Sequence, residues 1–118
     1  MWLYLSVCGL SSTIIHAQTP GSDPPVVRGR QLARIECSQC HVVSPDQEYP
    51  PSLEVSAPSF EAIADRRTTS EKSLRHFIST THWDGQKIPM TMPAPELTKQ
   101  ETAAIVAYIL SLRKNGRH

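Results

Sequence analysis

Residues 27–41 read VRGRQLARIECSQCH, and this stretch carries the clearest structural signal in the chain. The spacing of its apolar residues predicts a helix that begins near Val27 and runs into two cysteines three positions apart. Cys37 and Cys40 are then separated by one helical turn, and His41 follows directly. Two thiols and an imidazole are therefore expected together at the end of one helix.

The pentad Cys37-Ser38-Gln39-Cys40-His41 has the C-x-x-C-H spacing of covalent haem attachment. Two thiols on one turn can reach two vinyl groups on adjacent rings of a porphyrin, and the next imidazole then lies under the iron. We therefore predict one haem c per chain as the cofactor. His41 is its predicted proximal ligand.

Other uses of the two cysteines remain as alternatives. A thioredoxin-type dithiol belongs in a strand-helix-strand unit, which the sequence lacks, and needs no histidine after the second cysteine. Zinc needs two further ligands, for which only His76 and His82 are candidates, six positions apart. A disulfide between Cys37 and Cys40 would leave His41 without a role. A zinc- or disulfide-stabilised binding module without haem is the corresponding alternative.

The composition limits the size of the core and the class of partner. The chain has 118 residues, with 12 Lys and Arg against 11 Asp and Glu, which excludes the strongly basic profile of a nucleic-acid binder. With 39% apolar and 6% aromatic residues, a single domain with a modest core is expected. A domain of this size tends to need a metal, a cofactor or a covalent cross-link.

The first segment predicts export. Residues 1–17, MWLYLSVCGLSSTIIHA, contain no Lys, Arg, Asp or Glu and are too short and too interrupted to span a bilayer. We interpret them as a signal peptide cut after Ala17, with Cys8 as an apolar residue that is removed. Residues 18–26 then form a flexible arm and residues 27–118 the folded domain. Export predicts a periplasmic location, without stable membrane insertion.

Three more helices are expected. The sequence contains no pair of segments with alternating apolar and polar residues on either side of a turn, so no β-hairpin is predicted. A short helix fits residues 59–65. A longer one follows a capping box of Thr68 and Glu71, and the last follows Thr98 and Glu101 in the same roles. The fold class is therefore all-α.

Proline-rich loops connect these helices. Residues 42–58 lack any helix or strand period, and a loop of that length in a small domain needs contacts other than secondary structure to hold it. Residues 83–97 form a second such loop. After the last helix, Arg113 and Lys114 are expected beside its negative end.

The chain resembles class I cytochromes c, which are small periplasmic electron carriers. The resemblance covers residues 29–112 and rests on Gly29 eight positions before the first cysteine, on the pentad, and on the ending MPAPELTKQETAAIVAYILSL. It implies the cytochrome c fold for the domain, with about four helices and long loops around one haem. It also implies that the first and last helices cross with Gly29 and Ala33 against Tyr108.

The resemblance further implies a methionine sulfur as the second axial ligand, on the loop before the last helix. Met92 precedes a proline and lies sixteen residues before Tyr108, as in the family, and is the predicted ligand. Met90, in the same loop, is the alternative. His82 is a further candidate, which would lower the reduction potential, whereas His76 is expected in solvent.

The surroundings of the haem follow from the same comparison. Pro58 resembles the loop proline whose nearby carbonyl orients the proximal imidazole. The expected pocket residues are Phe60, Leu74, Phe77, Ile78, Ile88 and the last helix's stripe of Ile105, Val106, Tyr108, Ile109 and Leu112. A cationic cluster, read either as a docking patch or as a solvated face, consists of Arg66, Arg67, Lys72 and Arg75.

With both axial positions filled by protein, the resemblance implies electron transfer rather than catalysis. The expected protein is a soluble monomer that exchanges single electrons with a redox donor and a redox acceptor, without a small-molecule substrate. One alternative is a haem c subunit or relay domain of a periplasmic dehydrogenase or oxidoreductase complex. Another is a sensor in which a small gas displaces Met92.

Overall fold

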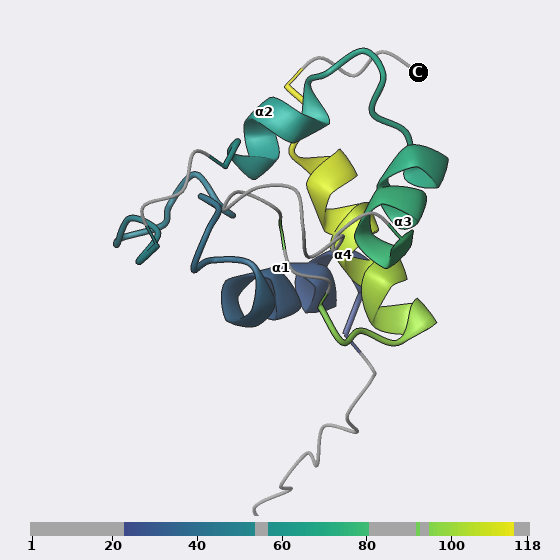
Figure 1. Ribbon diagram of the computed structural model, residues 1–118, viewed down its shortest axis with the longest axis horizontal. Helices are drawn as coiled ribbons and strands as arrows, with labels where there is room; N and C mark the ends of the chain where they lie inside the picture. The colour runs from purple at the N-terminus through teal and green to yellow at the C-terminus, as the bar shows by residue number, and fades with distance from the viewer. Residues whose placement is uncertain (1–22, 54–56, 81–91, 93–94, 115–118) are drawn as a thin grey trace, which may run out of the picture.

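The computed structural model describes residues 23–53, 57–80, 92 and 95–114, which contain four helices and no strand. The helices are α1 (Pro25–Glu36), α2 (Phe60–Ala64), α3 (Glu71–Thr80) and α4 (Lys99–Ser111). α4 contacts each of the other three, and Figure 1 shows α1 crossing it while α2 and α3 lie to either side. The all-α prediction is confirmed. Residues 1–22, which carry the predicted signal peptide, lie outside the described residues.

The crossing of α1 and α4 depends on Gly29. A Cβ atom at this position would lie 1.9 Å from the backbone oxygen of Ala104 and 2.8 Å from the Cβ of Tyr108. Real Cβ atoms do not approach other atoms so closely, so only glycine allows the two backbones to meet here. Ala33, one turn later, is fully buried in the same core. The crossing expected at Gly29 is confirmed.

The hydrophobic core lies around α4. Its apolar stripe is buried in the core, where α4 contacts α1, α2 and α3. The buried core residues are Ala33, Cys37, Val43, Phe60, Ala64, Leu74, Ile78, Ile105, Val106, Tyr108 and Ile109. Leu112 is partly buried against this cluster. The apolar pattern of the last helix thus predicted the side that packs inward.

α1 begins two residues earlier than the apolar pattern predicts. Pro25 occupies its first position, where the missing N–H costs nothing because the first helical N–H groups have no intrahelical partner. The helix ends at Glu36, and both cysteines follow in the turn after it.

The predicted cap of α3 is wrong. The N–H of Ser73 donates to Ser70 Oγ at 3.1 Å, and the N–H of Ser70 donates to Ser73 Oγ at 2.8 Å. Because the helix begins at Glu71, that glutamate is one residue past the cap and cannot reach back to Thr68. It forms an ion pair with Arg75 instead. Ser70 and Ser73 therefore fill the roles assigned to Thr68 and Glu71.

The capping box of α4 is confirmed. The N–H of Glu101 donates to Thr98 Oγ1 at 3.2 Å, and the N–H of Thr98 donates to Glu101 Oε2 at 2.9 Å. These hydrogen bonds from Thr98 lower the pKa of the Glu101 carboxyl. The start of α4 is thereby fixed directly after the second proline-rich loop.

The residue after the C-cap of α4 holds a neighbouring segment. The helix ends at Ser111 with Leu112 as its C-cap. Arg113 Nε donates to the carbonyl of Ala64 at 2.9 Å, and its Nη2 donates to the carbonyl of Thr69 at 2.8 Å. The side chain of Arg113 thus ties the α2–α3 connection to the end of α4, while its N–H donates to the carbonyl of Leu110 in the last turn of its own helix.

Replacing Arg113 with alanine is expected to lower the free energy of unfolding by about 1.5–3 kcal/mol, because charge-assisted hydrogen bonds to two carbonyls are lost. Urea unfolding of the haem-loaded protein measures this change. Lys114→Ala is the matched control, since its ammonium only pairs with Glu61 at 3.3 Å near the surface. Equal effects of the two substitutions would refute the role given to Arg113.

Candidate functional site

The two cysteines and His41 lie in the hydrogen-bonded turn that follows α1. Cys37 is the C-cap of the helix, and its N–H donates to the carbonyl of Ala33 at 3.0 Å. The carbonyl of Cys37 then accepts from the N–H groups of Cys40 at 3.2 Å and His41 at 3.0 Å. The turn therefore presents the three side chains from one short, fixed piece of backbone.

The imidazole of His41 is buried and oriented. Only 8% of the residue is exposed, and Nδ1 donates to the carbonyl oxygen of Pro58 at 2.7 Å. This hydrogen bond places the proton on Nδ1, so Nε2 keeps the lone pair that a metal ligand needs. The ring of Phe60 lies beside it, with centroids 5.5 Å apart and planes inclined by 54°. The expected partnership of Pro58 with this histidine is confirmed.

One pocket brings together the candidate haem ligands. It is lined by Glu36, Cys37, Cys40, His41, Met92 and Pro95. Met92, a residue far along the chain, is therefore placed beside the pentad. The other candidates, Met90 and His82, lie outside the described residues, as does Ile88.

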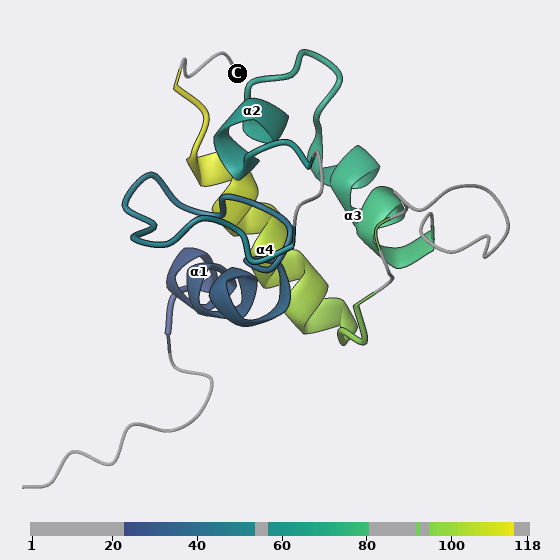
Figure 2. The ribbon, with the colours of Figure 1, turned by 60° about the vertical axis from the view of Figure 1, so that its left-hand side comes forward.

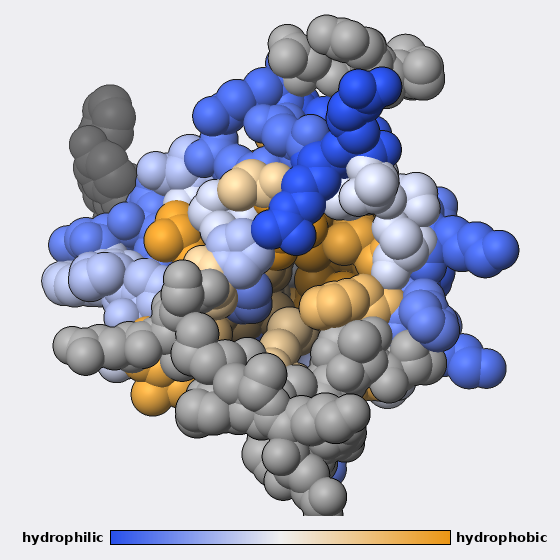
Figure 3. Space-filling view, turned by 45° about the horizontal axis from the view of Figure 1, so that its top comes forward, coloured by the Kyte–Doolittle hydropathy of each residue, from blue (hydrophilic) through white to orange (hydrophobic). Residues whose placement is uncertain are grey.

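A larger cavity of about 430 Å³ adjoins this pocket at Pro95. Its described lining residues are Arg75, Ile78, Ser79, Pro95, Leu97, Lys99 and Thr102, so apolar and cationic side chains share its wall. Figure 3 shows that one face of the molecule is hollowed, with apolar side chains on the floor of the hollow. Two thiols, an imidazole and a thioether beside such space fit the attachment and ligation of a haem.

The thiol of Cys37 is poorly suited to dithiol chemistry. Burial, followed by the nearby charges of Glu36 and Cys40, raises its pKa to about 12. Reactive cysteines have lowered pKa values and often lie at the N-terminus of a helix, whereas Cys37 follows the C-terminus of one. Cys37 and Cys40 do not form a disulfide with each other. The thioredoxin-type alternative is therefore disfavoured.

Zinc is disfavoured on different grounds. Within residues 23–53, 57–80, 92 and 95–114, no three His, Cys, Asp or Glu side chains converge closely enough to hold a metal ion. Cys37, Cys40 and His41 share a pocket without forming an ion-sized cage. A planar group that reaches the sulfurs at its edge and the imidazole at its centre suits this arrangement better.

Long-range hydrogen bonds hold the described part of the first long loop. The N–H of Leu53 donates to the carbonyl of Gln39, and the N–H of Phe60 donates to the carbonyl of Val42, each at 2.9 Å. An ion pair between Asp46 and Arg30 ties the loop to α1. In Figure 2 the loop lies above α1. The prediction that contacts other than secondary structure hold this loop is confirmed for the part described.

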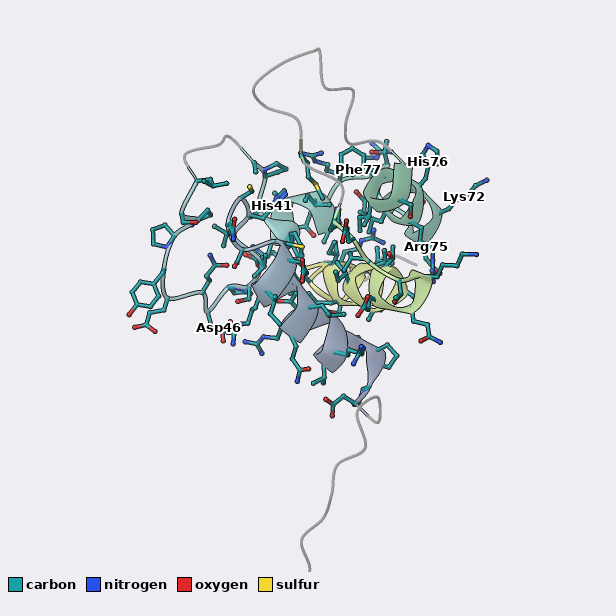
Figure 4. All side chains as sticks on the ribbon, turned by 60° about the horizontal axis from the view of Figure 1, so that its bottom comes forward. His41, Asp46, Lys72, Arg75, His76 and Phe77 are labelled. Atoms are coloured by element: carbon teal, nitrogen blue, oxygen red, sulfur yellow. The ribbon has the colours of Figure 1, made fainter. Side chains whose placement is uncertain are left out.

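α3 has two different sides. In Figure 4, Phe77 lies on the side of α3 nearer to His41, and Lys72, Arg75 and His76 lie farther from it, although Arg75 also lines the larger cavity. Phe77 is 48% exposed, so it is not part of the buried core that includes Leu74 and Ile78. The side that carries Lys72 and Arg75 has an internal ion pair, between Arg75 and Glu71. This pairing favours the solvated-face interpretation of the cationic cluster.

The sequence did not reveal one contact near the proximal histidine. The hydroxyl of Tyr108 donates to the carbonyl of Val43 at 2.8 Å, across 65 positions of sequence. The N–H of Val43 donates to the side chain of Gln47. The apolar stripe marked Tyr108 as a core residue, but nothing in the pattern indicated what its hydroxyl would bind.

Comparison with known proteins gives one finding. The family model described as Cytochrome c matches residues 26–113. Searches of curated proteins and of solved structures found no match. Among the helices of the described residues, none combines the length and apolar character that crossing a membrane requires.

Proposed function

Since this chain belongs to the cytochrome c family, we propose that it is a soluble periplasmic electron carrier of the class I type. Its haem would be attached to Cys37 and Cys40 and ligated by His41 and Met92. The observation that carries this proposal is that these four side chains line the same pocket, although Met92 comes from a distant loop.

The family implies covalently bound haem c and electron transfer rather than catalysis. When bound, haem c supplies one-electron exchange between ferric and ferrous iron. Cys37 and Cys40, in the turn after α1, would hold the porphyrin by thioether bonds. His41 offers Nε2, because its Nδ1 is bonded to Pro58. Met92 offers a soft thioether sulfur, which favours the reduced state and raises the potential.

Burial of the ligands supports the role of a carrier. His41 and Cys37 are both buried, and Met92 is partly buried, which limits access of water or a substrate to this pocket. If His41 and Met92 both held the iron, no coordination position would be left for a substrate, electron exchange would occur without one, and no separate catalytic residue would be needed. The proposed location follows from residues 1–17, interpreted as a signal peptide.

Potentiometry and carbon monoxide binding test this function on the haem-loaded mature protein. We expect a single reversible one-electron couple, an unchanged spectrum when carbon monoxide is added to the reduced protein, and elution as a monomer in gel filtration of the periplasmic extract. Rapid formation of a carbon monoxide complex would indicate a gas sensor instead. Elution only with a dehydrogenase would replace the free carrier by the subunit alternative.

A further inference from the structure

We propose that the hydroxyl of Tyr108 is a positioning group for the proximal ligand: it holds the backbone after His41 and thereby keeps the imidazole against the carbonyl of Pro58. The inference rests on the proposed function, because it requires His41 to be the axial ligand. It adds a residue of α4 to the groups that control the haem potential.

The hydroxyl acts on the backbone two residues beyond the histidine. Tyr108 Oη donates to the carbonyl of Val43 at 2.8 Å, and both residues are buried. The N–H of Val43 donates to Gln47 Oε1 at 2.8 Å. Both polar groups of the Val43 peptide backbone are therefore engaged, and the segment after His41 is held from outside the haem turn.

A second pair of contacts holds the same segment from the side of α2. The carbonyl of Val42 accepts from the N–H of Phe60 at 2.9 Å, and Pro58, two residues earlier, accepts from the imidazole of His41. The ring of Phe60 lies 5.5 Å from that of His41 and 6.4 Å from that of Tyr108, between ring centroids. The histidine and its carbonyl partner are thus fixed by two sets of contacts, of which Tyr108 supplies the one from α4.

Tyr108 is itself tightly placed. It is 4% exposed, and its Cβ lies where α1 passes α4 at Gly29. A buried side chain in such a contact has little freedom to move its hydroxyl. The crossing of the two helices therefore fixes the position of the donor as well as the core.

The hydrogen bond of His41 affects the reduction potential of the iron through the basicity of the imidazole. A hydrogen bond from Nδ1–H to a carbonyl makes the imidazole a stronger donor through Nε2, and a stronger donor stabilises the ferric state. Without the Tyr108 hydroxyl, the carbonyl of Val43 loses its partner and the segment moves toward other donors. The bond between His41 and Pro58 then weakens, so the reduction potential rises.

The test is Tyr108→Phe in the haem-loaded protein. We expect the ferric-to-ferrous equilibrium to shift about threefold toward the reduced form, which is about 28 mV at 59 mV per tenfold change for one electron. Solvent exchange of the His41 ring N–H, followed by NMR, should become about tenfold faster because the bond opens more often. A loss of overall stability also speeds exchange, because opening of the whole fold exposes the ring N–H, so the inference requires the shift in potential as well.

Tyr49→Phe is the matched control, because this tyrosine lies in the loop that contains Val43 but is 72% exposed. It should leave both readouts unchanged. An unchanged potential and exchange rate in folded Tyr108→Phe would overturn the inference, as would equal shifts in both variants. If Tyr108→Phe does not fold, 3-fluorotyrosine at position 108 serves instead, because its hydroxyl is a stronger donor of nearly the same size. Slower exchange of the His41 ring N–H and a lower reduction potential are then expected. Any other result overturns the inference. Failure of the proposed function would be distinct, since it would appear in the wild type as carbon monoxide binding or as elution only with a dehydrogenase, and neither readout depends on Tyr108.

Discussion

Replacing Gly29 with alanine should lower the free energy of unfolding by about 3 kcal/mol, the upper end of the usual range for an overpacked core. The added methyl would lie 1.9 Å from the Ala104 oxygen, and that atom belongs to the backbone of α4. A backbone atom cannot rotate away as a side chain can, so the two helices would have to separate. Urea unfolding of the haem-loaded variant measures the loss.

The control for this substitution is Gln31→Ala, two positions along α1, where the side chain is exposed. Alanine there improves helix propensity slightly and meets no other helix, so stability should hardly change. A Gly29→Ala variant as stable as the wild type would mean that α1 and α4 do not cross at this position.

Replacing Met92 with leucine is expected to remove the sixth ligand while keeping the haem attached. The weak band from sulfur to ferric iron near the red end of the spectrum should disappear. The potential should fall by roughly 100 mV, within the range of about 0.8 V over which axial ligands tune haems. Carbon monoxide should then bind to the reduced variant, because one axial position is open. Absorption spectra and potentiometry record all three changes.

Met90→Leu is the matched control for Met92→Leu, since it makes the same substitution two positions away in the same loop. It should retain the sulfur band and the potential. The reverse result, with the band lost only in Met90→Leu, would move the ligand to Met90. Loss of the band in neither variant would favour His82 or another ligand.

The outline of the fold could be predicted because three features are local in sequence. The pentad places the end of α1, Thr98 and Glu101 place the start of α4, and the apolar stripe of α4 identifies its buried side. Each depends on residues within one or two turns of each other, which a helix brings together without help from the rest of the chain.

The errors came where near neighbours compete for one role. Thr68 and Ser70 both precede α3 and both carry a hydroxyl that can cap a helix. Which of the two hydroxyls caps the helix depends on where the helix begins. It begins at Glu71, which puts Ser70 at the cap position. The side-chain partners of Arg113 could not be predicted for a different reason, because Ala64 and Thr69 lie 49 and 44 positions away.

The sequence indicated which candidate ligands could lie near one another, but not which contacts hold them in place. His41 follows from the pentad, and Pro58 followed only from family resemblance. The bond from Tyr108 to Val43 could not be predicted, because a tyrosine in an apolar stripe gives no indication of the partner of its hydroxyl. Such contacts between distant segments depend on how the helices cross.

The central claim is that haem is joined covalently to Cys37 and Cys40. The most direct measurement extracts the purified mature protein with acidified organic solvent and then records the pyridine haemochrome spectrum of the protein fraction. We expect the pigment to stay with the polypeptide and to give the spectrum of a haem with two thioether bonds. Pigment that passes into the solvent, or a folded protein without colour after full maturation, would contradict it.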